Sequence, residues 1–225
     1  RRLALSRFYT LHLHLYIPYL PYARQDRINN EGEAFTLKVF CDYVNSLGFD
    51  TVYTFDNHSD VSTALLNNCI NVPNFKFVRE VVDLQKDKYM LVCPDAGAAK
   101  KIYKLAKSLG YTKEIIFVDK VRNTATGKIE KIEVQPIKSD TKGKTLIIVD
   151  DICSYGGTFI GTAEQLRKEY EFETLILVVS HFEGVADPLI LSKWFKYVFT
   201  SNSIDFAPQD AVISQIKIDL HWLTS

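Results

Sequence analysis

Short runs of apolar, often β-branched residues alternate along most of the chain with longer segments in which apolar residues recur every three or four positions. Several short runs are apolar at nearly every position, a pattern typical of parallel strands covered by helices on both faces. The runs that predict strands are 11–17, 51–55, 89–93, 114–118, 145–149 and 175–179. This alternation predicts an α/β fold with mainly parallel sheets flanked by helices.

Three of the longer segments have the spacing of amphipathic helices. The first covers residues 35–47 and precedes Gly48, the second covers Ile102–Leu109 and precedes Gly110, and the third covers 158–170. A glycine directly after a helix favours its termination, because glycine adopts the left-handed backbone conformation without a steric penalty. Helices placed between strands in this way predict right-handed βαβ units.

The 225-residue chain has no net charge, because 27 Lys and Arg residues balance 27 Asp and Glu residues. Binding to nucleic acid through its phosphates needs a surplus of cations, so no nucleic-acid partner is expected. The apolar runs are all shorter than the about 20 residues of a membrane span, so no membrane partner is expected either. The four cysteines are far apart in the sequence and form no CxxC pair, so we expect reduced thiols. Because thiols stay reduced in the cytosol, the sequence predicts a cytoplasmic protein.

The order of the elements predicts two α/β units of related topology. The first covers residues 1–75 and the second covers 76–205. The boundary is predicted at Asn71–Asn74. The polar, lysine-rich segment 123–145 is either a hairpin or a mobile flap. The chain opens with Arg-Arg-Leu, so we expect a fragment or a product whose beginning is missing.

The most informative motif is a predicted buried strand that ends in Asp150 and Asp151 and is followed by a glycine-containing loop and a helix. Ligands of open α/β sheets bind beyond the carboxyl ends of the strands. The N–H groups and dipole of the helix start favour an anion, and Gly156 and Gly157 allow the main chain to approach a phosphate closely. The carboxylates suit sugar hydroxyls or Mg²⁺. The motif therefore indicates a ribose 5-phosphate site; the alternative is an ordinary glycine turn beside backbone-capping aspartates.

Residues Asp150–Thr158 resemble the ribose-phosphate binding signature of the type I phosphoribosyltransferase fold. Ile17–Arg27, which reads IPYLPYARQDR, is similar to the ATP-binding stretch of ribose-phosphate pyrophosphokinases, the synthetases of phosphoribosyl pyrophosphate. Phe55–His58 and Cys93–Gly97 resemble the Asp-x-His and Pro-Asp-x-Gly elements of that family. Asp119–Arg122 resembles the start of its catalytic flexible loop. The likeness runs in order through most of the chain, which is more specific than any single motif.

The resemblance implies transfer of the β,γ-diphosphate of ATP to the anomeric hydroxyl of ribose 5-phosphate, with Mg²⁺ as cofactor and AMP as product. It also implies a homo-oligomer, a first unit that is incomplete at its start, and a tail at 206–225 that returns to the first unit. The catalytic residues that it implies are Lys120 and Arg122, and the metal-binding residues are His58 and Asp95. The ATP-binding residues that it implies are Arg24, Gln25, Asp26, Arg27 and His58. The residues that it implies for the ribose-phosphate acceptor are Asp150, Asp151, Ile152, Cys153, Ser154, Tyr155, Gly156, Gly157 and Thr158.

Without the resemblance, several of these residues have simpler interpretations. Lys120 and Arg122 are typical of solvated cations after a strand, and His58 is typical of a surface or capping histidine. Cys153 lies near a predicted helix start, where a thiol can become a nucleophile. The implied reaction needs no covalent nucleophile, so we interpret Cys153 as a small loop residue.

Differences from the family pattern suggest other functions. Ser154 and Tyr155 stand where the family loop usually has Asp and Thr, and Tyr155 could stack on a base attached through the 5-phosphate, by about 1–3 kcal/mol. The second hypothesis is therefore the same transfer onto an acceptor such as ADP-ribose. The family has a segment before the stretch matched here that contributes to the ATP site, so a catalytically silent regulatory homologue is the third. A plain phosphoribosyltransferase would need a hood over the nucleobase, for which the sequence offers no candidate.

Overall fold

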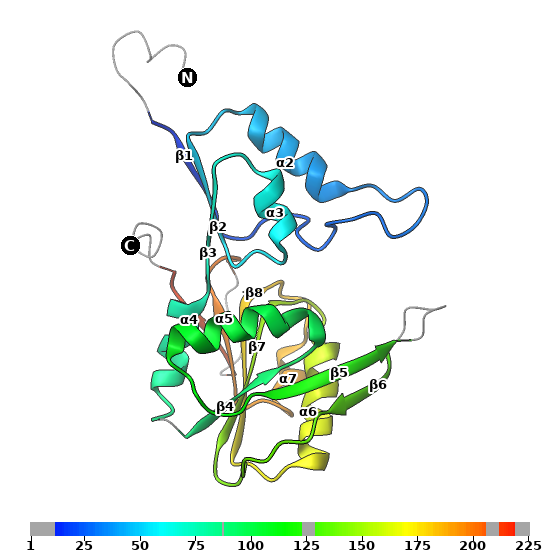
Figure 1. Ribbon diagram of the computed structural model, residues 1–225, viewed down its shortest axis with the longest axis vertical. Coiled ribbons are helices and arrows are strands. Elements are labelled where there is room, and N and C mark those ends of the chain that lie inside the picture. The colour runs from blue at the N-terminus through cyan, green and yellow to red at the C-terminus, as the bar shows by residue number, and fades with distance from the viewer. Residues whose placement is uncertain (1–11, 87, 123–128, 206–211, 219–225) are drawn as a thin grey trace. The chain divides into compact units, whose positions relative to one another are not determined.

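The computed structural model describes residues 12–86, 88–122, 129–205 and 212–218 (Figure 1). The chain forms two compact units that divide between Pro73 and Asn74, at the end of the predicted boundary segment. Strand β10 (Ile213–Ile216) lies in the predicted tail and joins the sheet of the second unit. The tail residues 206–211 and 219–225 lie outside the described part.

The first unit contains a parallel three-stranded sheet in the order β1-β2-β3. Its strands and helices are β1 (His14–Ile17), α2 (Thr36–Ser46), β2 (Thr51–Phe55), α3 (Asp60–Leu65) and β3 (Cys69–Val72). Leu37, Cys41 and Val44 recur at helical spacing on the buried side of α2 and pack with Val52 of β2. Burial of this apolar stripe holds α2 on the sheet.

The second unit contains a seven-stranded sheet in the order β10-β9-β8-β7-β4-β5-β6. Its other strands are β4 (Tyr89–Cys93), β5 (Ile116–Arg122), β6 (Ile129–Val134), β7 (Thr145–Cys153), β8 (Thr174–Phe182) and β9 (Tyr197–Ser201). All neighbouring strands are parallel except β5 and β6, which form an antiparallel hairpin. The central strands are apolar at nearly every position because both faces of the sheet are covered.

The helices of the second unit lie on both faces of this sheet (Figure 1). They are α4 (Phe75–Asp83), the 3₁₀ turn η1 (Ala96–Ala98), α5 (Ala99–Leu109), α6 (Gly157–Glu169) and α7 (Pro188–Leu191). The crossovers β4-α5-β5 and β7-α6-β8 run in opposite directions along the sheet, so their right-handedness puts α5 and α6 on opposite faces. The carboxyl ends of β4 and β7 therefore lie at a topological switch point, where ligands of such sheets bind.

Two strands continue further than their apolar runs predict, and both extensions concern the site. Strand β7 continues from the predicted end at Val149 to Cys153, so the two aspartates lie inside the strand. Strand β5 continues to Arg122 because β6 pairs with it, so Lys120 lies in a hairpin strand and the prediction of a loop there is wrong. Segment 123–145 thus contains a hairpin strand, while residues 123–128 lie outside the described part.

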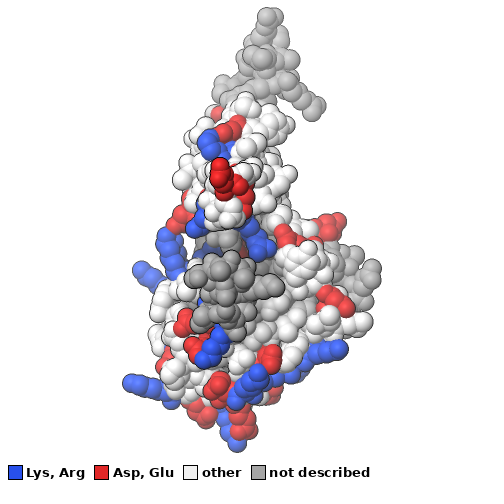
Figure 2. All heavy atoms as spheres, turned by 90° about the vertical axis from the view of Figure 1, so that its right-hand side faces the viewer, with Lys and Arg blue, Asp and Glu red and all other residues white. Residues whose placement is uncertain are grey.

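The surface and the helices agree with the balanced composition. On the face shown in Figure 2, basic and acidic side chains are interspersed over the second unit, as expected for a chain with zero net charge. Within the described residues, the structure contains no helix that combines the length and the apolar character needed to cross a membrane.

Candidate functional site

The carboxyl edge of three neighbouring strands in the second unit brings together most of the predicted acidic and catalytic residues. Strand β4 is paired with β7 on one side and with β5 on the other, and all three are parallel. Asp95 follows β4, Lys120 lies in β5, and Asp150 and Asp151 lie in β7. The fold therefore gathers these four residues at one edge from segments that are far apart in the sequence.

Asp95 and Lys120 form an ion pair at this edge. Lys120 Nζ donates to Asp95 Oδ2 at 2.8 Å, and the lysine side chain is only 5% exposed. The other carboxylate oxygen of Asp95 accepts a hydrogen bond from the Ala98 N–H at 3.0 Å and so caps η1. Burial alone would raise the pKa of Asp95, but the hydrogen bond and charge of Lys120 outweigh it and the pKa is lowered. A buried ammonium group is thus held at the strand edge.

Asp150 and Asp151 form a second acidic group beside Asp95. Lys101 Nζ donates to Asp151 Oδ2 at 2.8 Å, and the Asp151 N–H donates to Asp150 Oδ1 at 2.9 Å. Burial, followed by the negative charges of Asp151 and Asp95, raises the pKa of Asp150 well above its ordinary value. Hydroxyl groups of a sugar would satisfy these carboxylate oxygens without adding charge.

Lys101 is a site residue that the sequence did not suggest. It lies on α5, and four residues later Leu105 is buried on the same side of the helix. A lysine on the apolar side of a helix is a signal that could have been used, because lysine is rarely buried unless its charge is paired. Its partner could not be identified in this way, because Asp151 is 50 residues away in the sequence.

The predicted loop after β7 contains two glycines with different surroundings. Gly156 is the N-cap of α6 and has a left-handed backbone with φ of +77°. A Cβ atom there would lie 3.2 Å from Leu191 Cδ2 and 3.4 Å from Ala186 Cβ. Gly157 begins α6, and a Cβ atom there would have no neighbour within 4 Å. Gly157 is the first residue of α6, and the first N–H groups of a helix favour anions.

The two glycines lead to opposite expectations for alanine variants. Gly156→Ala forces a side chain into the left-handed region, costs about 1–2 kcal/mol and lowers the melting temperature by about 2–8 °C. Gly157→Ala keeps the melting temperature but fills the space over the helix start, so ribose 5-phosphate should bind at least about tenfold more weakly. Calorimetric titration and thermal unfolding measure both effects. Equal binding by Gly157→Ala and the wild type would contradict a phosphate at this position.

The side chain of Cys153 belongs to the hydrophobic core. It is fully buried, packs with Phe159 and Phe182, and is therefore not available to a ligand except through its main chain. Burial, with smaller effects of the Asp150 and Glu183 charges, raises the pKa of Cys153 to about 12. This thiol is neutral at physiological pH, in agreement with its interpretation as a structural residue.

Cys153 is accordingly expected to resist alkylation in the folded protein. At pH 8, a thiol with a pKa of about 12 is ionised in only about one molecule in 10,000. Iodoacetamide should modify Cys153 after unfolding in guanidinium chloride but not before, as measured by peptide mass spectrometry. Stoichiometric labelling of the native protein would show that the thiol is reactive and exposed.

The other loop residues differ in exposure. Tyr155 is 78% exposed, so its ring is open to solvent beside the start of α6. Ser154 and Thr158 are half-buried. Ile152 is half-buried within β7 and is paired in register with His181 of β8. An exposed aromatic ring next to an anion site offers a stacking surface to a larger ligand.

In the first unit, the predicted ATP-binding segment follows β1. Asp26 is buried and accepts hydrogen bonds from Arg27 Nε at 2.7 Å and Arg27 Nη2 at 3.1 Å. The Arg27 hydrogen bond, helped by nearby Ser59 and His58, lowers the pKa of Asp26 although its burial acts in the opposite direction. Two nitrogens of the Arg27 guanidinium thus contact Asp26, while its side chain is 68% exposed. The side chains of Arg24 and Gln25 are exposed.

The second predicted element of the first unit follows β2, the neighbour of β1. Asp56 has a positive φ of 43°, which is rare for a residue with a side chain, and His58 is exposed. Asn57 was not predicted. Its amide oxygen and nitrogen are buried without a hydrogen-bond partner in the structure, while its N–H donates to Asn71 Oδ1. Strained and unsatisfied groups after a strand are typical of a functional edge.

The predicted metal-binding residues are divided between the units. His58 belongs to the first unit and Asp95 to the second. Among the described residues, no group of three or more His, Cys, Asp or Glu side chains could hold a metal ion. Arg122 lies at the end of β5, and its side chain is outside the described part.

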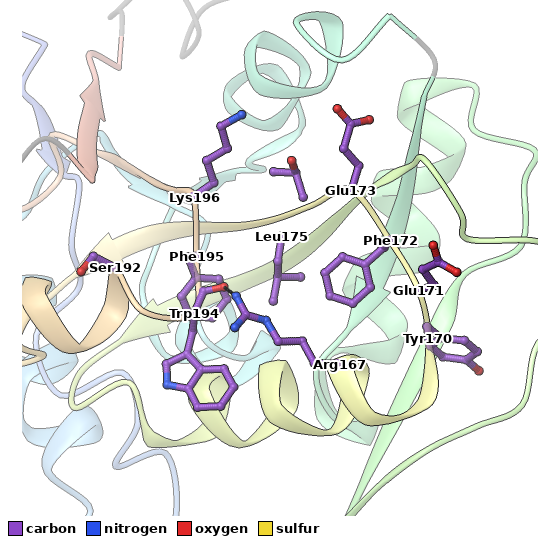
Figure 3. Close-up of a pocket in the computed structure, with 11 residues that line it drawn as sticks. Arg167, Tyr170, Glu171, Phe172, Glu173, Leu175, Ser192, Trp194, Phe195 and Lys196 are labelled. Atoms are coloured by element: carbon purple, nitrogen blue, oxygen red, sulfur yellow. Dashed lines mark hydrogen bonds between the residues drawn. The ribbon is translucent and has the colours of Figure 1, made fainter.

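A cavity of about 600 Å³ lies elsewhere in the second unit, near the amino end of β8 (Figure 3). Arg167 crosses it, donates to the Trp194 carbonyl at 2.8 Å and lies 5.1 Å from the centre of the Trp194 ring. Leu175 and Phe195 are buried at its base. None of the predicted site residues lines this cavity, so it is separate from the candidate site.

Comparisons with known proteins show what the chain is similar to. Residues 74–212 match the phosphoribosyl transferase domain family. The ribose-phosphate pyrophosphokinase of Sulfurisphaera tokodaii is 30% identical over 205 residues, which are 89% of this chain and 68% of the relative. The ribose-phosphate pyrophosphokinase of Mycoplasma pneumoniae is 34% identical over 212 residues, which are 88% of this chain and 62% of the relative. The ribose-phosphate pyrophosphokinase of Thermococcus kodakarensis is 32% identical over 159 residues, which are 69% of this chain and 54% of the relative. The matched part thus spans about half of the length of that relative.

A solved structure gives the same result for the fold. The phosphoribosylpyrophosphate synthetase from Mycobacterium smegmatis matches 95% of this chain and 70% of its own, with a TM-score of 0.77 and 23% identity. The prediction of an α/β fold of the phosphoribosyltransferase type, with mainly parallel sheets flanked by helices, is confirmed.

Proposed function

Because the chain belongs to the ribose-phosphate pyrophosphokinase family, we propose that it is a divergent ribose-phosphate diphosphokinase. The anomeric oxygen of ribose 5-phosphate attacks the β-phosphorus of ATP and loses its proton. The bond from this phosphorus to the oxygen that bridges it to the α-phosphorus breaks, and that oxygen leaves with AMP. The observation that carries the proposal is the meeting of Lys120, Asp95 and the Asp150–Asp151 pair at one strand edge.

The acceptor is proposed to lie across β7 and the start of α6. The carboxylates of Asp150 and Asp151 accept hydrogen bonds from its 2- and 3-hydroxyls, while Lys101 keeps Asp151 in place. The 5-phosphate lies above Gly157, on the first N–H groups of α6. This arrangement directs the anomeric carbon away from the loop, toward the arriving nucleotide.

Lys120 is the proposed source of positive charge for the transferred diphosphate. Phosphoryl transfer depends mainly on positioning and on cations that stabilise charge on the phosphate oxygens. The Lys120 ammonium is fixed by one hydrogen bond to Asp95 and retains further N–H donors for a ligand. Arg122, two residues further along β5, is proposed to assist.

The nucleotide is proposed to bind the edge of the first unit. Arg24 and Gln25 offer exposed donors and acceptors, and Asp26 holds Arg27 in a defined orientation. His58 lies close enough to Asp26 to influence its pKa, so the two segments after β1 and β2 form one surface. Homo-oligomerisation remains a prediction.

Mg²⁺ is the proposed cofactor, and the donor set favours an ion shared with the substrate. Asp95 and Asp151 each have one carboxylate oxygen on a lysine ammonium, so they do not form an all-protein cage. Mg²⁺ is commonly bound by one or two protein carboxylates, and the phosphate oxygens of a substrate complete its coordination. Asp95 would be the protein ligand that the second unit supplies to this ion. When bound, the ion would neutralise charge on the β- and γ-phosphates.

The proposal is tested by incubating the complete protein with Mg-ATP and ribose 5-phosphate. Formation of AMP and phosphoribosyl pyrophosphate in equal amounts is expected. No AMP with any acceptor, combined with a changed rate of an added active synthetase, would instead support the non-catalytic regulatory homologue.

A second acceptor is favoured by one observation, the 78% exposure of Tyr155 beside the phosphate loop. An acceptor with a base attached through its 5-phosphate, such as ADP-ribose, could stack on this ring for about 1–3 kcal/mol. Tyr155→Thr is then expected to weaken ADP-ribose binding by about 5- to 150-fold and to leave ribose 5-phosphate binding nearly unaffected. Tyr155→Phe keeps the ring and is the matched control. Inactivity of the wild type with ADP-ribose would exclude this acceptor.

A further inference from the structure

We infer that Gly161 is a positioning residue that sets the distance between Lys120 and the ribose-phosphate loop; this inference rests on the proposed function. Gly161 lies in α6, four residues after Gly157. A Cβ atom at Gly161 would lie 2.4 Å from Cδ1 of Ile132 in β6, closer than real Cβ atoms approach a neighbour. A side chain at position 161 would therefore displace Cδ1, the terminal methyl group of the Ile132 side chain, while Cγ1 at 3.9 Å stays in ordinary contact.

The backbone of α6 gives no other reason for a glycine at this position. Gly161 lies inside the helix and has no positive φ. Glycine destabilises a helix interior relative to alanine, because it loses more conformational freedom on folding. The glycine at position 161 thus serves to let Ile132 of β6 approach α6 closely.

Ile132 connects this contact to the catalytic lysine. It is paired directly with Lys120 across the antiparallel β5–β6 hairpin, so the two side chains lie on the same face. The Lys120 ammonium is in turn 2.8 Å from Asp95 Oδ2. A displacement of the Ile132 side chain therefore acts on the face of the hairpin that carries Lys120.

The same contact is tied to the phosphate loop through α6. Helix α6 begins at Gly157, directly after the N-cap Gly156, and its middle lies against β6 (Figure 1). Ile132 is partly buried and packs against the main hydrophobic core, so a new rotamer of its side chain would alter contacts with that core. The Gly161–Ile132 contact thus links the acceptor site to Lys120, where an error of about 1 Å can cost about 100-fold in rate.

Two single variants and their combination test this inference. Gly161→Ala is expected to lower kcat for AMP formation by about 10- to 100-fold, while KM for ribose 5-phosphate changes by less than about twofold. Ile132→Val removes Cδ1, the atom that the new methyl group would meet. Adding Ile132→Val to Gly161→Ala should therefore restore most of the lost kcat. Glu164→Ala, at an exposed position of the same helix, is the control and should keep the wild-type kcat.

Two outcomes would overturn the inference. The first is an unchanged kcat for Gly161→Ala. The second is a loss of kcat that the additional Ile132→Val change does not restore, because such a loss indicates an effect on the helix alone. Melting temperatures test the contact independently of activity, because Gly161→Ala should stabilise the Ile132→Val protein more than it stabilises the wild type. A wild type that forms no AMP would contradict the proposed function, whereas additive melting temperatures would contradict the contact.

Discussion

Replacing Lys120 by alanine is expected to reduce AMP formation by at least about 1,000-fold, the effect of removing a single cation from a phosphoryl-transfer site. Lys120 is 5% exposed and is held on Asp95, so solvent or a neighbouring lysine cannot substitute for it easily. KM for ribose 5-phosphate should change little, because the acceptor is bound by β7 and α6. Steady-state kinetics of AMP release measure both parameters.

Lys131→Ala is the matched control for this variant. Lys131 lies on the other strand of the same hairpin, is largely exposed and pairs with Glu133, so its loss should leave the rate within about twofold of the wild type. Circular dichroism and thermal unfolding check that both variants are folded. A folded Lys120→Ala protein with more than about a tenth of the wild-type rate would remove Lys120 from the catalytic role.

Asp151→Asn is expected to lower kcat/KM for ribose 5-phosphate by about 100-fold. The substitution keeps the shape of the side chain but removes a charged hydrogen-bond acceptor, and such a hydrogen bond contributes about 1.5–3 kcal/mol. It also removes the ion pair with Lys101, whose ammonium would then repel other cations in the site. The kinetic constants for both substrates give the effect, which should be much smaller for KM of ATP.

The partner of Asp151 provides the control. If Lys101 acts only by holding Asp151, Lys101→Met should lower kcat/KM, but adding it to Asp151→Asn should cause little further loss. Glu164→Gln, at an exposed position of α6, should have no effect. Full additivity of the two changes would show that Lys101 contributes separately, and a wild-type kcat/KM for Asp151→Asn would contradict the acceptor site.

The fold could be predicted from the sequence where local pattern determines structure. The runs 51–55 and 89–93 form β2 and β4 with the predicted bounds. Strand β4 is buried at every position and apolar throughout, and β2 consists of the β-branched and aromatic residues that favour strands. Gly110 ends α5 in the left-handed conformation, as its position after the helix predicted. Strands β3, β9 and β10 have only four or five residues and were not predicted, since their pairing partners, rather than their own pattern, define them.

The site was predictable only where its residues are consecutive or match a family motif. Asp150 to Thr158 are neighbours in the sequence, so the strand, loop and helix start could be expected together. The pairing of Lys101 with Asp151 depends on a tertiary contact between residues that are 50 positions apart in the sequence. The extension of β5 through Lys120 depends on pairing with β6, a strand with charged residues that composition alone assigns to a surface segment.

The most direct test of the central claim is a crystal structure of the complete protein with ribose 5-phosphate. The 5-phosphate is expected within hydrogen-bond distance of the Gly157 and Thr158 N–H groups, with the sugar hydroxyls on the carboxylates of Asp150 and Asp151. A sugar phosphate bound at another place, or none at a concentration that saturates binding in solution, would contradict the account.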